Sequence, residues 1–153
     1  MARTTIVQGF RGYEGSGYDR GAVLFDARVS VARHTAQKND KRIYRAGNRS
    51  FIGKGSKTKA LTDELTARLL QLRRGIPSID YPVSLEIEVV TPMLTKKKER
   101  NKKLIDLDNA IQGPIDSLVK AGILEDDRWI DRLFVRRIDG ENSLRIIIQA
   151  LEE

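Results

Sequence analysis

The hydrophobic pattern is clearest over residues 83–90, where apolar and polar side chains alternate. The apolar set is Val83, Leu85, Ile87 and Val89, and the polar set between them is Ser84, Glu86 and Glu88. Successive side chains of a strand point to opposite faces. The alternation therefore predicts a strand with one buried face and one face in water.

Two segments repeat their apolar residues with helical spacing. The leucines at positions 61, 65, 69 and 72 predict an amphipathic helix with Ser56 or Thr58 as its N-cap, which ends near residue 74, before Gly75. A second apolar face over residues 111–119 predicts another helix, which Gly122 would end.

The remaining pattern predicts a mixed sheet. Strands are expected over residues 4–8, 22–31, 133–138 and 144–151, with a short hairpin around residues 43–52. The turn at residues 139–142 predicts that the last two strands pair as a hairpin. This order of elements predicts an α+β fold, a single domain with one mixed β-sheet and two main helices packed on one face.

The expected domain spans residues 22–153. Before it, residues 1–21 form a Gly/Arg/Tyr-rich N-terminal extension or loop. Glycine permits many backbone conformations, which favours a flexible loop, but aromatic and arginine side chains between glycines also suit stacking on nucleic-acid bases.

Composition narrows the class of protein. The chain has 153 residues, of which 40% are hydrophobic, and its 28 Lys and Arg against 21 Asp and Glu give a net charge of +7. Such an excess favours a polyanionic partner. The absence of cysteine excludes disulfides, thiolate zinc sites and cysteine nucleophiles. No apolar run approaches the roughly 20 residues that span a bilayer, so we expect a cytoplasmic protein with no membrane partner.

Candidate chemistry gathers in one region. Asp106-Leu107-Asp108-Asn109 is followed one helix later by Asp126-Asp127, and the loop before it, residues 92–105 (the basic loop), carries the densest positive run. Its basic residues are Lys96, Lys97, Lys98, Arg100, Lys102 and Lys103. Carboxylates hold divalent cations and lysines and arginines hold phosphates, so the pattern indicates a metal-dependent enzyme acting on nucleic acid. If the turn after the helix returns Asp127 to the sheet end, three carboxylates converge.

A simpler interpretation is open at this point. Asp108 could cap the helix that follows, Asp106 could favour the helix dipole, and Asp126-Asp127 could be ordinary turn residues. The basic run could equally be a solvated loop. His34, the single histidine, is expected at the surface.

The aspartate motif, with Asp116-Ser117-Leu118, Lys120-Ala121-Gly122 and Glu125-Asp126-Asp127 after it, resembles the RusA family of Holliday-junction resolvases. The resemblance covers residues 83–150 well and residues 22–75 loosely. It implies a homodimeric endodeoxyribonuclease that nicks four-way junction DNA in homologous recombination and DNA repair. It also implies that Asp106, Asp108 and Asp127 are the catalytic residues and hold Mg²⁺, with Mn²⁺ as a possible substitute.

One position departs from the family. The resemblance implies a catalytic lysine four residues after Asp108, and this chain has Gln112 there. Glutamine donates hydrogen bonds but brings no positive charge. A Gly113-Pro114 pair follows, so the helix either kinks or starts afresh with Pro114 as its first residue. Besides the nuclease, two alternatives stay open: a non-catalytic DNA-binding protein on the same fold, and a basic RNA-binding protein of unrelated fold.

Overall fold

The computed structural model describes residues 4–7, 21–35 and 41–151. Its main sheet has five strands in the order β1-β2-β7-β5-β6. Their bounds are β1 Thr4–Val7, β2 Val23–Ser30, β5 Val83–Thr91, β6 Ile130–Asp139 and β7 Ser143–Ala150. β5 and β6 run parallel and the other neighbours run antiparallel, so the sheet is mixed.

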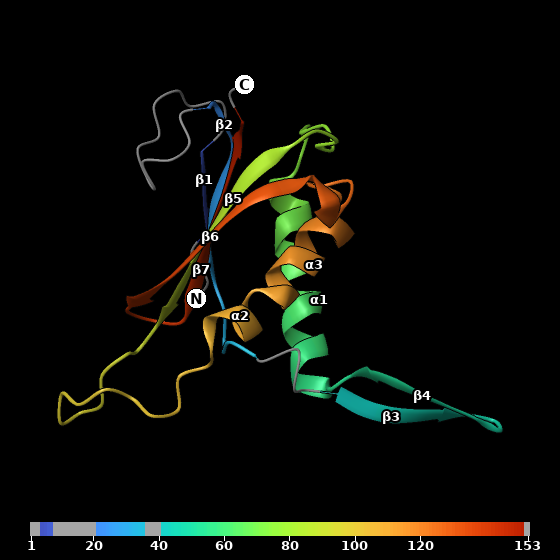
Figure 1. Cartoon of the computed structure of the whole chain (residues 1–153), viewed down its shortest axis with the longest axis vertical. Coiled ribbons are helices and arrows are strands. Elements are labelled where there is room, and N and C mark those ends of the chain that lie inside the picture. The colour runs from blue at the N-terminus through green and yellow to red at the C-terminus, as the bar shows by residue number, and fades with distance from the viewer. Residues whose placement is uncertain (1–3, 8–20, 36–40, 152–153) are drawn as a thin grey trace.

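The helices cover one face of this sheet (Figure 1). They are α1 (Ser56–Leu72), α2 (Leu107–Ala110) and α3 (Gln112–Lys120), followed by the 3₁₀ turn η1 (Asp127–Trp129). The core lies between the sheet and α1 and α3, where Phe25, Leu65, Leu85, Leu118 and Ile146 are fully buried. The predicted α+β domain with one mixed sheet and two main helices is confirmed.

α1 follows the predicted leucine stripe. Leu61, Leu65 and Leu69 are buried against the core. The helix begins at Ser56 with Gly55 as its N-cap, so neither Ser56 nor Thr58 is the capping residue. Gly75, three residues past its end, has a positive φ of 75°, which suits glycine at the end of a helix.

The predicted hairpin of the last two strands is wrong. β6 and β7 do not pair with each other, because both pair with β5, which lies between them. Their connection crosses the end of β5, where the Gly140 amide donates to the Thr91 carbonyl oxygen at 3.1 Å. A parallel pair needs a long crossover, and the helices between β5 and β6 provide it.

The predicted wet face of β5 is also wrong. Glu86 and Glu88 are only 4% and 3% exposed. Glu88 bonds to Arg136 at 3.1 Å and to Arg145 at 3.2 Å, while Glu86 lies 3.7 Å from Arg136. These arginines stand on β6 and β7, on either side of β5, so the charges of the glutamates are compensated where they are buried.

The second predicted helix, over residues 111–119, is confirmed within one residue at each end as α3, and the short α2 precedes it. The chain breaks at Ile111 into the short α2 and the longer α3, which begins at Gln112. Pro114 therefore lies in the first turn of α3, where its missing N–H would have had no partner within the helix. The helix does start afresh, two residues before Pro114.

The predicted strand over residues 4–8 is confirmed as β1, an edge strand of the sheet. Most of the Gly/Arg/Tyr-rich segment, residues 8–20, lies outside the described residues. Among the helices of the described part of the chain, none is long and apolar enough to cross a membrane. The expected hairpin around residues 43–52 is present as β3 (Lys41–Ala46) and β4 (Arg49–Lys54), a separate two-stranded sheet.

Candidate active site

The first two candidate carboxylates lie at the start of α2. Asp106 occupies the N-cap position, where its backbone carbonyl accepts from the amides of Asn109 and Ala110, both at 3.0 Å. Its side chain makes no capping hydrogen bond and is exposed, as is that of Asp108 in the first turn. Asp108 is therefore not the N-cap, and the Asp106 carboxylate does not act as a capping group.

The basic loop is an ordered turn. Leu94 and Arg100 form an antiparallel bridge, and the amide of Asn101 donates to the Met93 carbonyl oxygen at 2.8 Å. At its tip the Thr95 amide donates to the Glu99 carbonyl oxygen at 2.7 Å. Lys96, Lys97 and Lys98 lie at this tip with their side chains exposed. Backbone hydrogen bonds thus hold the lysines away from the domain, a placement that suits contact with phosphates.

A hollow joins the basic loop to Asp106. It has a volume of about 510 Å³ and is lined by Arg100, Asn101, Lys102, Leu104, Asp106 and Arg137. Arg137 comes from β6, and its Nη2 donates to the Ile105 carbonyl oxygen at 2.5 Å. The hollow therefore places three cationic side chains around one exposed carboxylate, at the junction of the sheet, the basic loop and α2.

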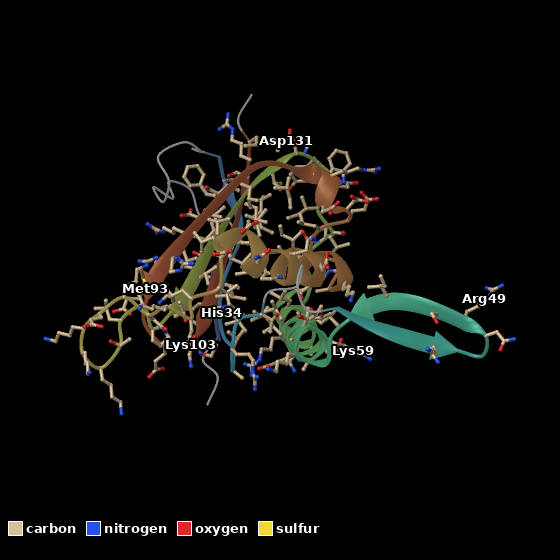
Figure 2. All side chains as sticks on the ribbon, turned by 60° about the horizontal axis from the view of Figure 1, so that its bottom comes forward. His34, Arg49, Lys59, Met93, Lys103 and Asp131 are labelled. Atoms are coloured by element: carbon tan, nitrogen blue, oxygen red, sulfur yellow. The ribbon has the colours of Figure 1, made fainter. Side chains whose placement is uncertain are left out.

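A smaller hollow of about 170 Å³ adjoins the first and also borders Arg137. His34 lies in its wall, close to Lys103 and Met93 at the foot of the basic loop (Figure 2). The ring is half-buried, contrary to the expected surface position, and its Nε2 donates to the Val90 carbonyl oxygen at 2.7 Å. Burial lowers the pKa of His34, outweighing that hydrogen bond, so the ring is neutral at neutral pH.

The third candidate carboxylate follows α3. Asp126 caps η1 by accepting from the Arg128 amide at 2.9 Å, which lowers its pKa. The side-chain hydrogen bond between Asp126 and Asp127 raises the pKa of the exposed Asp127, helped by slight desolvation and by the negative charges of Asp126 and Asp116. Asp126 thus serves the turn, as the simpler interpretation expected. Asp127 instead lies in a concentration of negative charge.

The sequence model of the endodeoxyribonuclease RusA family matches residues 31–150, which is most of the chain. The chain belongs to the RusA family. The match includes the motif Asp106-Leu107-Asp108-Asn109, the basic loop, Arg137 and the Asp126-Asp127 pair. No curated protein is similar enough to the chain to give a named relative. Membership supports nuclease activity on branched DNA, and RusA nucleases generally depend on divalent metal ions.

Gln112, at the position where the resemblance leads us to expect a lysine, is a neutral side chain. The Gln112 Nε2 donates to Asp116 Oδ1 at 3.3 Å, one turn further along α3. Gln112 is thus directed along the helix towards Asp116. Gln112 and Asp116 lie one turn apart on α3, and the negative charge of Asp116 also acts on Asp127, whose pKa it helps to raise.

The expected convergence of three carboxylates does not occur within one chain. Asp106 and Asp108 lie before α3 and Asp127 lies after it, so the helix separates them (Figure 1). Among the described residues, no three His, Asp or Glu side chains lie close enough together to hold a metal ion. The single chain therefore offers no complete protein cage. The Asp106 and Asp108 pair does fit Mg²⁺, which usually takes one or two carboxylates and fills its other positions with water and phosphate.

Sequence reasoning missed two residues at this site. Arg137 lies in a segment that the sequence pattern predicts only as a strand. The available signal was that Arg136 and Arg137 are adjacent, which breaks the alternation of apolar and polar residues along β6. Asp116 was seen only as part of the family motif, yet its charge reaches Asp127 and its carboxylate holds Gln112. Its spacing of four residues from Gln112 was the available signal.

Proposed function

We propose that this RusA protein is a Mg²⁺-dependent, structure-selective endodeoxyribonuclease that nicks four-way junction DNA in recombination and repair. The observation that carries the proposal is the hollow beside Asp106. There an exposed carboxylate without a capping role adjoins Arg100, Lys102 and Arg137. An acidic group surrounded by cations suits a phosphodiester substrate better than a neutral one.

In this proposal the cationic side chains bind the DNA backbone and the carboxylates bind the metal ion. The side chains of Arg100, Lys102 and Arg137 would hold the DNA backbone in the hollow, and Lys96, Lys97, Lys98 and Lys103 would contact phosphates from the rest of the basic loop. Asp106 and Asp108 would hold Mg²⁺ or Mn²⁺. When bound, this ion would activate water and stabilise the charge that develops on the scissile phosphate.

A homodimer would complete the site. Because Asp127 lies beyond α3 in its own chain, we propose that it serves the pair Asp106 and Asp108 of a second copy. A two-fold axis that brings one such contact together brings the other together as well. Two sites related by symmetry would match the near two-fold symmetry of a four-way junction and give paired nicks.

The experiment is a nicking assay on a synthetic four-way junction with purified protein, in Mg²⁺ and in EDTA, with Asp108→Asn as the inactive variant. Paired nicks that need the metal and disappear in Asp108→Asn are expected. Equal nicking by the variant would exclude a catalytic role for Asp108. Linear duplex of the same sequence is the control for structure selectivity.

A second candidate function is a non-catalytic DNA-binding protein on the same fold. The observation in its favour is Gln112, which brings no charge and is hydrogen-bonded to Asp116. Tight junction binding without nicking in either Mg²⁺ or Mn²⁺ would favour this candidate. Nicking would exclude it.

A further inference from the structure

The strands β3 and β4 form a ribbon that projects from the domain (Figures 1 and 2). They pair only with each other, and neither packs substantially against another named element. Gly47 and Asn48 make the turn, with Gly47 at a positive φ of 62°. Arg49 lies at the far tip and Lys59, in the first turn of α1, lies near the base (Figure 2).

The charge of this region is exceptional for the chain. Residues 41–59 hold Lys41, Arg42, Arg45, Arg49, Lys54, Lys57 and Lys59 and no acidic residue. Their charge equals the net charge of +7 of the whole chain, so the basic and acidic residues elsewhere balance. Arg45, Arg49, Lys57 and Lys59 are exposed. The ribbon itself holds five of these seven charges, and Lys57 and Lys59 follow it at the start of α1.

We propose that the β3–β4 ribbon enters the major groove of a duplex arm of the DNA substrate, away from the branch point. This inference rests on the proposed function for the identity of the nucleic acid. The major groove of B-DNA is about 12 Å wide and admits a two-stranded ribbon. Six residues per strand give a length of about 20 Å, enough to cross the groove between its two phosphate backbones.

The position of the ribbon fits a role in holding DNA. The ribbon and the basic loop leave the same end of the domain, with α2 between them (Figure 1). DNA bound by both would pass Asp106 and Asp108 at the start of α2. Ile52, which is 71% exposed on β4, offers an apolar contact of the kind that thymine methyl groups make in the major groove. An RNA duplex would not fit, because its major groove is too narrow and deep.

The test uses the double variant Arg45→Gln/Arg49→Gln, which alters the ribbon near its tip. The matched control is Arg28→Gln/Arg74→Gln, which removes the same charge from exposed arginines outside the ribbon. Affinity for a junction with long arms, for plain duplex DNA and for duplex RNA is measured as a function of salt concentration. Methylation of guanine N7, which lies in the major groove, is mapped with and without the full protein.

The intact protein is expected to protect guanines in one major groove of an arm, and the ribbon variant is expected to lose that protection. Its affinity should fall about tenfold, and the slope of log affinity against log salt should fall by about two, since each phosphate contact contributes roughly 0.9.

Three outcomes would overturn the ribbon proposal: unchanged affinity and slope in the ribbon variant, an equal loss in the control variant, or protection confined to the branch point. Stronger binding to duplex RNA than to duplex DNA would do so as well. If the intact protein binds DNA without nicking, the proposed nuclease function fails while the protection pattern still decides the ribbon.

Discussion

The guanidinium of Arg137 donates through Nη2 to the carbonyl oxygen of Ile105, the residue directly before Asp106. The bond joins β6 to the end of the basic loop, so the rigid sheet fixes the backbone that carries the first candidate carboxylate. Arg137 also borders the hollow beside Asp106. One side chain thus positions Asp106 and contributes positive charge to the same place.

Arg137→Gln is expected to reduce the nicking rate by about a hundredfold, because misplacing a catalytic group by about 1 Å has an effect of that size. Arg137→Lys should retain the charge but lose part of the positioning of Asp106. Its nicking rate should therefore lie between those of the native protein and Arg137→Gln. Single-turnover nicking and junction affinity should be measured separately. A fall in affinity with no change in rate at saturation would show that Arg137 only binds DNA.

Complementation between inactive variants tests the shared site. In a mixed dimer of Asp108→Asn and Asp127→Asn chains, one site carries both substitutions and the other carries none. We expect each variant alone to be inactive and the mixture to recover nicking of one strand per junction. A mixture of Asp106→Asn and Asp108→Asn is the control, and it should stay inactive. No recovery in the first mixture would place all three carboxylates in one chain.

The carboxyl of Asp127 should titrate above its usual value of 3.8, mainly because of its hydrogen bond with Asp126. A raised pKa means that the folded chain holds this proton more tightly than the unfolded chain. Its small stabilising contribution is therefore present at low pH and lost as pH rises through the folded pKa. Asp126→Asn should lower the pKa of Asp127, as followed by carboxyl carbon NMR. An unchanged pKa would contradict the assigned cause.

Glu88→Gln tests the buried ion pairs of the sheet. The substitution leaves Arg136 and Arg145 without a shared carboxylate that is 3% exposed in the native protein. We expect the free energy of unfolding to fall by about 2 kcal/mol, less than for a fully buried pair because both arginines are partly exposed. Urea denaturation measures it. Glu64→Gln, which breaks the surface pair with Arg68, is the control and should change stability by less than about 0.5 kcal/mol.

Gln112→Lys should raise the nicking rate by about tenfold, since a charge near the scissile phosphate stabilises the transition state. Gln112→Met, of similar length but uncharged, separates charge from loss of the bond to Asp116. Single-turnover nicking in Mg²⁺ is the measurement. Equal rates in the native protein and the Lys variant would show that other cationic side chains, such as those that line the hollow, already stabilise the charge of the transition state.

The elements of the fold were predictable because local patterns determine them. The leucine stripe of α1 and the alternation of β5 report burial of one face directly. The strand neighbours were not predictable in this way. The choice of β5 rather than β7 as the partner of β6 depends on a parallel crossover, and the burial of Glu86 and Glu88 depends on arginines about 50 residues away in sequence.

The candidate site was predictable in part. Asp106, Asp108 and the basic loop are neighbours in sequence, so their proximity in space followed from chain connectivity. The position of Asp127 depended on the length and direction of α3, and a break at Ile111 could not be inferred from apolar spacing alone. Arg137 reaches the loop from 32 residues away, a separation over which sequence carries no distance information.

The central place of β7 in the sheet has a consequence for synthesis. β7 is the last strand along the chain, yet it is the one that joins β2 to β5. While the ribosome is still making residues 143–150, the strand pairs β1–β2 and β5–β6 have no common partner, and the backbone edges of β2 and β5 that β7 joins stay unpaired. The sheet cannot assemble before these eight residues are made. Until then the unpaired strand edges of the growing chain are open to aggregation.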